Sequence, residues 1–194
     1  VEQGEDLVTD LVEVGEDVVS AGWIVGFVFT MVTGGNDTMT GMLGGSAELL
    51  TDHRDQRRLL LDHPELLTGA VEELLRLTSP VQNLARTTTR DVEIRDVTIP
   101  AGEKVLLLYG SANRDERAFG DDADELDVRR GIDKMLSLGY GAHHCLGASA
   151  ARLQARVALG RLLERFPDFE VDAAAGRFAP GGFVRRYESL PFTT

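Results

Sequence analysis

The feature that most constrains this chain is the run Leu-Gly-Tyr-Gly-Ala-His-His-Cys-Leu-Gly at residues 138–147, which contains the only cysteine among 194 residues. A single cysteine cannot form a disulfide within the chain, so it is a buried packing residue, a reactive thiol or a metal ligand. Buried packing is the commonest of these roles. The glycines at 139, 141 and 147 argue against it here, because glycine lets the backbone turn sharply and approach a flat partner closely.

The residues after this loop predict a helix from Ala148 to Phe166, with Leu159 and Leu163 at helical spacing. Cys145 then lies at a helix N-terminus, where free N–H groups and the positive end of the helix dipole favour thiolate over thiol. A thiolate that a flat group can approach across glycine backbone is what an axial ligand to haem iron requires.

The loop resembles the haem-ligand loop of the cytochrome P450 family, Phe-Gly-x-Gly-x-His-x-Cys-x-Gly, at every position but one, where Leu138 replaces the usual Phe. Three further motifs follow the family's order. Gly-Gly-Asn-Asp-Thr at 34–38 resembles the oxygen-activation motif of its long central helix. Glu73-Leu-Leu-Arg76 resembles its Glu-x-x-Arg pair, and Arg86 resembles the strand arginine that contacts a haem propionate. Each motif alone is modest support for the family, whereas four in order are strong support.

The resemblance extends from about Ser20 to Phe192 and begins just before the central helix of a family whose members are much longer. It implies a mainly α fold with a small β-sheet, corresponding to the C-terminal, haem-ligand half of the P450 fold. We expect residues 1–194 to form a single partial domain without the N-terminal half. We also expect this chain alone not to be a competent monooxygenase, because apolar residues such as Trp23, Ile24 and Phe29 would lose their cover.

The function that the resemblance implies is that of a haem-thiolate monooxygenase, which inserts one oxygen atom from O2 into a small organic substrate. Cys145 would ligate the iron of haem b. His143 and Arg86 would bond the two propionates, because Arg and His form charge-assisted hydrogen bonds to carboxylates. The residues implied to bind the cofactor are Cys145, His143, Arg86, Gly34, Leu138, Gly139 and Gly147.

Other roles are open for two of these residues. Arg86 is alternatively an exposed strand residue paired with an acid. His143, next to His144 and Cys145, is alternatively part of a zinc site, although zinc needs four ligands at regular spacing and adjacent residues rarely all face one ion.

The electrons would come from NAD(P)H through a reductase and an acidic ferredoxin-type donor, since nothing in the chain resembles a flavin or nicotinamide site. A row of arginines on the last helix is a candidate docking face, although such a row is usually a solvated face. It consists of Arg152, Arg156, Arg161 and Arg165. The competing interpretation is a truncated, non-catalytic remnant that binds haem poorly or not at all. A thiol redox protein would need a resolving cysteine, which the chain lacks.

The long central helix contains a local contradiction. Gly34 and Gly35 together cost about 2 kcal/mol of helix propensity relative to alanine. Thr38 can bond the carbonyl of Gly34 and bend the helix, which would make room for dioxygen and a water. Asp37 and Thr38 are then the candidate catalytic residues, as proton-delivery groups. In the alternative interpretation the glycines allow close helix packing and Asp37 caps a helix end.

Glu73 and Arg76 lie three residues apart, so they share a helix face and can form an ion pair. Most such pairs are exposed and contribute less than about 1 kcal/mol. The resemblance implies a buried structural pair that holds the coil before the cysteine loop, with a third, basic partner from that coil. The family often has Arg-Phe there, whereas this chain has Glu-Leu at 125–126, so Arg129 and Arg130 are the candidates.

Composition fits a globular chain, since 43% of residues are apolar and 27% are charged. The net charge of −12 argues against nucleic-acid binding, which needs clustered Lys and Arg. One cysteine and no visible signal peptide favour a cytoplasmic location in a bacterium. The longest apolar stretch, residues 18–32, is shorter than the roughly 20 residues of a membrane span and is predicted to be a buried core helix.

The remaining pattern predicts helices at 7–14, from 17 to about 50, and from 64 to about 78 with a break near Gly69. Strands are predicted at 84–89, 92–94 and 104–108, with a turn at 100–102. Residues 113–133 are expected to be irregular, and 171–194 to contain short strands.

Overall fold

The computed structural model describes residues 4–194. By its internal contacts this part of the chain forms two compact units, one ending at Asp37 and one running from Thr38 to Thr194. The longest helix, α2 (Ala21–Asp52), contains residues of both units. The hydrophobic core and the cysteine loop belong to the second unit.

The first unit contains α1 (Leu7–Glu13) and the beginning of α2. Asp6 starts α1, because its carboxylate accepts the N–H groups of Val8 and Thr9 at 2.9 and 3.0 Å. In α2, Trp23 and Phe27 lie one turn apart and stack with their ring centroids 5.5 Å apart.

Residues 18–32 are not a buried core helix, and that prediction is wrong for this chain. No residue of α2 before Gly41 is buried, and Trp23 and Phe29 are 54% and 68% exposed. The apolar sequence selects a helix, but burial also requires a second apolar surface to pack against. The expectation that Trp23 and Phe29 lack cover is confirmed.

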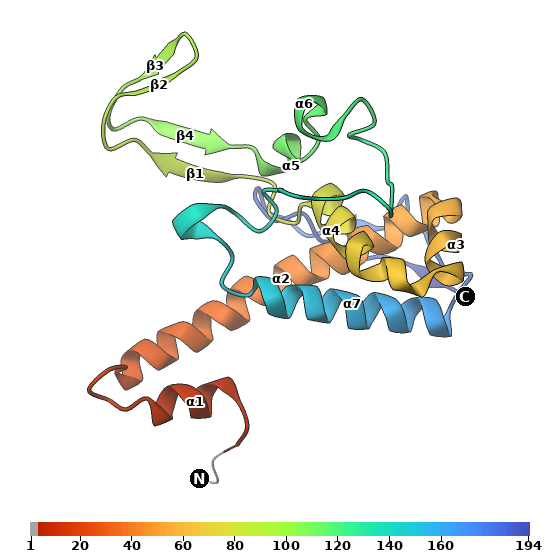
Figure 1. Ribbon diagram of the computed structural model, residues 1–194, viewed down its shortest axis with the longest axis horizontal. Helices are drawn as coiled ribbons and strands as arrows, with labels where there is room; N and C mark the ends of the chain where they lie inside the picture. The colour runs from red at the N-terminus through yellow and green to blue at the C-terminus, as the bar shows by residue number, and fades with distance from the viewer. Residues whose placement is uncertain (1–3) are drawn as a thin grey trace. The chain divides into compact units, whose positions relative to one another are not determined.

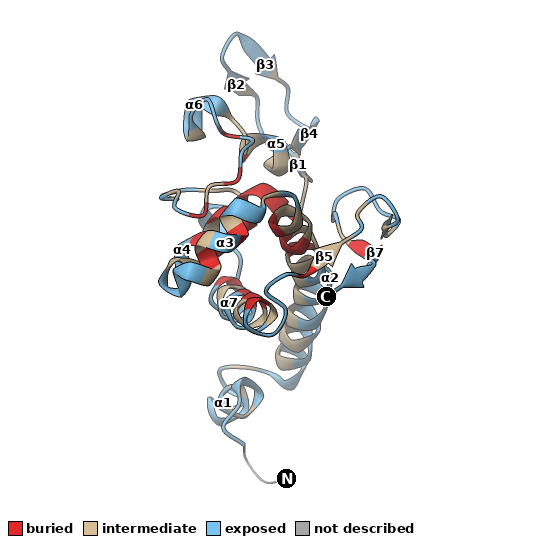
Figure 2. Cartoon of the chain, turned by 90° about the vertical axis from the view of Figure 1, so that its right-hand side faces the viewer, coloured by how far each residue is buried: buried red, intermediate tan, exposed pale blue. Residues whose placement is uncertain are grey.

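The core of the second unit is helical. It lies between the C-terminal part of α2 and three further helices, and Figure 2 shows the buried residues gathered where these helices face one another. Figure 1 shows α4 and α7 running alongside each other. The helices are α3 (Arg54–Asp62), α4 (Leu67–Thr78) and α7 (Ala148–Arg165), and Pro64–Leu66 forms a short 3-10 turn, η1, before α4.

The predicted break near Gly69 is wrong, because α4 continues through this residue. A glycine costs about 1 kcal/mol in a helix interior. Burial of the neighbouring Ala70, Val71 and Leu74 outweighs that cost. The helix ends at Ser79, which adopts the left-handed conformation with φ +39° just before Pro80.

The strands pair as four two-stranded antiparallel sheets rather than as one sheet, and one of the strands, Val97–Ile99, was not predicted. The first pairs β1 (Leu84–Thr87) with β4 (Lys104–Leu107), and Arg86 lies opposite Val105. The other pairs are β2 (Val92–Ile94) with β3 (Val97–Ile99), β5 (Glu170–Val171) with β8 (Phe192–Thr193), and β6 (Arg177–Phe178) with β7 (Tyr187–Ser189).

The region predicted to be irregular contains one short helix, α6 (Glu116–Phe119), and another, α5 (Tyr109–Ala112), directly precedes it. The mainly α fold with small sheets is confirmed. No helix within residues 4–194 is long and apolar enough to cross a membrane.

Candidate functional site

The cysteine loop is a tight turn that backbone hydrogen bonds close. The N–H of Cys145 donates to the carbonyl of Leu138 at 2.7 Å, and the N–H of Gly139 donates to Leu136 at 2.9 Å. Gly139 has a φ of +72°, and a Cβ at this position would lie 2.6 Å from the carbonyl oxygen of His143. Only glycine fits here, because a side chain would be strained and would also clash.

One end of this loop is buried and the other is open. Leu138, at the position where the related loop has Phe, is 9% exposed and belongs to the hydrophobic core. The thiol of Cys145 is exposed, and its apolar neighbours Tyr140 and Leu146 are 76% and 69% exposed. The loop therefore presents a soft sulfur donor between apolar side chains, which suits a large, flat, apolar metal complex.

Helix α7 begins at Ala148, three residues after Cys145, and Gly147 is its N-cap residue. The N–H groups of its first turn have no acceptor within the helix, and the positive end of the helix dipole lies on the side of the loop. This confirms the predicted position of Cys145 near a helix N-terminus.

His143 ends the short 3-10 turn η2 (Gly141–His143) and is exposed. Arg86 lies in β1, where its guanidinium donates to the carbonyl of Ala85 at 3.0 Å. Within residues 4–194 neither side chain is paired with a carboxylate, which does not support the alternative of Arg86 as a strand residue held by an acid. Both side chains can therefore donate hydrogen bonds to a carboxylate from outside the chain.

The fit of haem to these residues follows from their chemistry. Haem is flat and apolar, and it carries two carboxylates and an iron that needs a ligand from the protein. The loop offers one accessible thiol with exposed apolar residues beside it, and within residues 4–194 neither His143 nor Arg86 is paired with a carboxylate. The described residues contain no group of three or more His, Cys, Asp or Glu side chains arranged to hold a metal ion.

The pair Glu73–Arg76 is fully buried, as the resemblance implied. Arg76 donates from Nε and from one terminal nitrogen to the two carboxylate oxygens of Glu73, at 2.7 and 2.8 Å. Its other terminal nitrogen donates to the carbonyls of Asn113 and Ala123 at 2.7 and 2.6 Å. Such a pair is a scaffold element, because its hydrogen-bonding groups are used within the chain.

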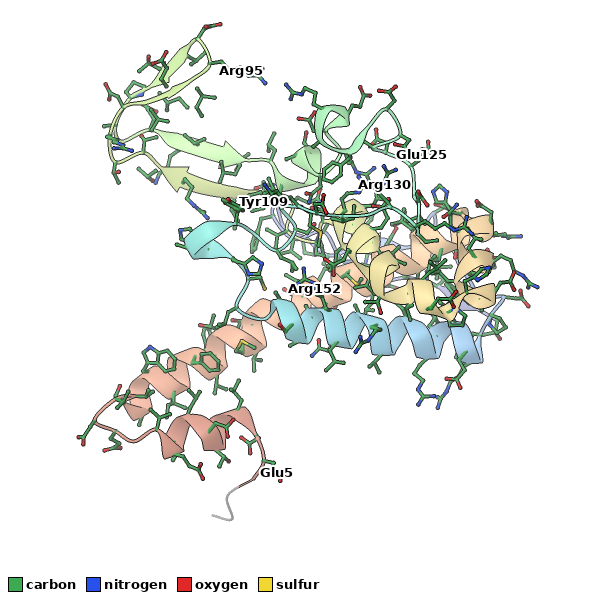
Figure 3. All side chains as sticks on the ribbon, viewed as in Figure 1. Glu5, Arg95, Tyr109, Glu125, Arg130 and Arg152 are labelled. Atoms are coloured by element: carbon green, nitrogen blue, oxygen red, sulfur yellow. The ribbon has the colours of Figure 1, made fainter. Side chains whose placement is uncertain are left out.

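The third partner of this pair is Arg130, which was one of the two candidates. Its Nε donates to Glu73 at 3.2 Å, and its terminal nitrogens reach Asp122 and the carbonyl of Phe119. The hydrogen bond to Asp122 is the main reason why the pKa of Arg130 is raised. Arg129 is exposed. Figure 3 shows Arg130 in the coil beside α4.

Sequence reasoning missed one residue and one contact around the site. Asn113 is completely buried, and hydrogen bonds join it to Arg76 and to the segment before the cysteine loop. We call Glu73, Arg76, Asn113 and Arg130 the Arg76 cluster. Nothing in the sequence distinguishes Asn113 from the polar residues around it, because its burial depends on the path of the coil.

The missed contact joins α7 to α4. Arg152 binds Glu72 through two hydrogen bonds of 2.6 and 2.9 Å, and Figure 3 shows Arg152 near the start of α7. These bonds are the main reason why the pKa of Arg152 is raised, and the nearby Cys145 adds a smaller electrostatic contribution. Arg161, of the same predicted row, pairs with Glu164 at 2.7 Å. Part of this arginine row is therefore neutralised.

Gly34, Asp37 and Thr38 all lie within α2, which is helical from end to end. A Cβ at Gly34 or Gly35 would meet no atom within 4 Å. Within the described residues, close packing is therefore not what requires these glycines. The roles of Asp37 and Thr38 in proton delivery stay a prediction.

A model of the family described as cytochrome P450 matches residues 46–175. Cytochrome P450 130 from Mycobacterium tuberculosis is 63% identical over 195 residues, which cover 98% of this chain and 48% of that protein. The steroid C26-monooxygenase of Mycolicibacterium smegmatis is 40% identical over 193 residues, with the same coverage of both chains.

The solved structures give the same result. The ligand-free P450 monooxygenase TamI matches with a TM-score of 0.91 and 38% identity, over 98% of this chain and 48% of that one. The chain spans about half the length of the curated relatives it matches. With a family model that matches most of its length and relatives that align over nearly all of it, the chain belongs to the cytochrome P450 family.

Proposed function

We propose that the protein containing this chain is a haem-thiolate monooxygenase that inserts one oxygen atom from O2 into a small organic substrate, with Cys145 as the iron ligand. Membership of the family implies haem. The observation that carries the assignment to Cys145 is the exposed thiol in a loop closed by the Cys145–Leu138 hydrogen bond, just before α7.

Haem b, when bound, supplies the redox chemistry that activates dioxygen, and a thiolate ligand favours cleavage of the O–O bond. In this proposal the chain's own residues hold the group and manage protons. His143 and Arg86 would donate hydrogen bonds to the two propionates, and Leu138, Gly139 and Gly147 would give the backbone its close approach. Gly34, Asp37 and Thr38 enter the proposal through the resemblance of residues 34–38 to the family's oxygen-activation motif, and Asp37 and Thr38 would deliver protons.

The electron supply in this proposal is NAD(P)H through a reductase and an acidic ferredoxin-type donor. Arg156 is exposed on α7 and has no acidic partner within residues 4–194, so it is a better candidate for docking an acidic protein than the neutralised Arg152. We also propose a cytoplasmic location for this reaction.

A steroid or a similarly apolar molecule is the substrate class we propose. One relative is named steroid C26-monooxygenase, and CYP109E1 from Bacillus megaterium, 29% identical and matching with a TM-score of 0.90, was solved in complex with testosterone. Both names describe those proteins, and they support an apolar substrate here by similarity.

The second candidate is a non-catalytic remnant that binds haem poorly. The exposure of Trp23 and Phe29 favours it for the 194 residues alone, because apolar surface of this kind drives association. The 194-residue chain by itself should then be poorly soluble or oligomeric. A monomeric 194-residue product with stoichiometric haem would overturn that expectation.

The experiment that tests the proposed reaction uses the complete polypeptide encoded by the gene, with NAD(P)H, a surrogate reductase and a ferredoxin. Candidate steroids are incubated under isotopically labelled dioxygen, and mass spectrometry measures the label in the product. We expect one labelled oxygen atom per product molecule, and none with Cys145→Ser. Product that carries oxygen from water would contradict a monooxygenase.

A further inference from the structure

A buried asparagine joins the Arg76 cluster to the cysteine loop. Asn113 has no exposed surface, although it lies in a region of mostly exposed charged residues. Buried amides are costly unless their donors and acceptors are all bonded. Each polar group of the Asn113 side chain has a partner, and these partners come from two separate segments, the end of α4 and the residues just before the cysteine loop.

The carboxamide of Asn113 makes three hydrogen bonds. Its Oδ1 accepts the backbone N–H of Leu136 at 2.7 Å. Its Nδ2 donates to the hydroxyl oxygens of Ser79 and Ser137, each at 2.8 Å. Ser79 ends α4, whereas Leu136 and Ser137 directly precede Leu138. One side chain therefore fixes the end of α4 against the start of the cysteine loop.

Further hydrogen bonds connect Asn113 to Arg76 and connect the segment that it holds to α4 and to Cys145. The carbonyl of Asn113 accepts a hydrogen bond from Arg76 at 2.7 Å. On the other side, the hydroxyl of Ser137 donates to the carbonyl of Leu75 at 2.7 Å, and Leu138 accepts the N–H of Cys145 at 2.7 Å. Asn113 and α4 thus hold Leu136 and Ser137 in place, and the next residue, Leu138, accepts the backbone hydrogen bond that positions Cys145.

We propose that Asn113 is a positioning residue for the Cys145 thiol: it transmits the fixed geometry of the buried Arg76 cluster to the loop that presents the sulfur. The part of this proposal that concerns iron ligation rests on the proposed function. Asn113 does not touch the thiol or the substrate. It acts by holding Leu136 and Ser137, so that Leu138 is correctly placed to accept the Cys145 N–H.

The site requires an amide in particular. The Leu136 N–H needs an acceptor, whereas the Ser137 hydroxyl already donates to Leu75 and so needs a donor as its partner. Aspartate would keep the acceptor but lose both donors, and it would bury a charge. Alanine would leave the Leu136 N–H without an acceptor in a buried position.

The test compares Asn113→Ala and Asn113→Asp with two controls in the complete polypeptide. Asn83→Ala removes an asparagine whose amide donates one bond, to the carbonyl of Gly182. Leu50→Ala removes a fully buried core side chain of α2 and so lowers stability through the hydrophobic core, leaving the hydrogen bonds of Asn113 in place. Hydrogen exchange measures local opening, and the Soret band of the reduced, CO-bound protein measures thiolate ligation.

We expect Asn113→Ala to raise amide exchange across residues 136–147 by about tenfold, with a much smaller change in α3. Leu50→Ala should raise exchange in both segments alike, and Asn83→Ala in neither. In the haem-loaded protein, Asn113→Ala should lose most of the red-shifted band, and Leu50→Ala should keep it at temperatures where it is folded. Asn113→Asp should follow Asn113→Ala in both measurements.

Equal exchange in residues 136–147 and α3 for both Asn113 variants, or a full red-shifted band in either, would overturn the positioning role. If Asn113→Ala does not fold, Ser137→Ala replaces it: this variant leaves the amide in place and removes the Asn113–Ser137 bond together with the Ser137–Leu75 bond, both of which hold the segment before the loop. A wild-type protein without the band would contradict the proposed function instead. In that case the exchange measurements would still decide whether Asn113 holds the loop.

Discussion

Hydrogen bonds through Asn113 join the Arg76 cluster to the segment before the cysteine loop, yet the polar groups of the two regions differ in exposure and in bonding. In the cluster, Glu73 and Arg76 are completely buried and bonded on all sides by the chain itself. In the loop, Cys145 and His143 are exposed and have no acidic partner within residues 4–194. The cluster's polar groups are thus used for folding, whereas those of the loop are available to the haem that we propose.

The largest effect on stability should come from Arg76→Ala. This change leaves the carboxylate of Glu73 buried without its main partner, which typically costs about 3–5 kcal/mol. Denaturant unfolding of the complete polypeptide measures the loss. The exposed Arg129→Ala serves as the matched control and should change stability by less than about 0.5 kcal/mol. Similar losses of unfolding free energy for Arg76→Ala and Arg129→Ala would contradict the distinction between the buried cluster and the exposed arginine.

Two glycines of the loop sharpen the comparison further. Both have positive φ, but a Cβ at Gly139 would meet the His143 carbonyl, whereas a Cβ at Gly141 would meet no atom within 4 Å. Gly139→Ala should therefore cost roughly 2–3 kcal/mol and Gly141→Ala about 1–2 kcal/mol, measured by thermal unfolding. If Gly141→Ala proved the more destabilising, the turn geometry described for the loop would be incorrect.

Thr38→Ala should have a small effect on stability, below about 1 kcal/mol. Its effect should appear in the reaction, because loss of the hydroxyl removes a proposed proton-delivery group. We expect haem binding to persist while electrons from NAD(P)H are diverted into peroxide. The ratio of product formed to NAD(P)H consumed measures this, and an unchanged ratio would leave Thr38 a helix residue only.

The main features of both the Arg76 cluster and the cysteine loop could be predicted from the sequence. The spacing of Glu73 and Arg76 predicts an ion pair, and glycine around Cys145 predicts a turn before a helix. The choice of Arg130 over Arg129 could not be predicted, because it depends on how the coil passes over α4. Asn113 was missed for the same reason, since its partners lie 23 to 34 residues away along the chain.

In α2 the error was to predict burial that the structure does not show. The apolar residues 18–32 predicted burial, and the helix is present, but its first half is exposed. Local sequence determines the helix, because its hydrogen bonds are local, whereas burial depends on a partner surface that no local pattern specifies. β3 was missed because Val97–Ile99 is short and stands directly before Pro100.

The most direct test of the central claim is the spectrum of the reduced, CO-bound protein, recorded for the complete polypeptide and for Cys145→Ser. His144→Ala is the control, since this exposed neighbour has no assigned role. We predict a red-shifted Soret band for the wild type and for His144→Ala, and no such band for Cys145→Ser. Both variants should unfold with nearly the stability of the wild type. A red-shifted band that persists in Cys145→Ser would contradict the assignment of Cys145 as the haem ligand.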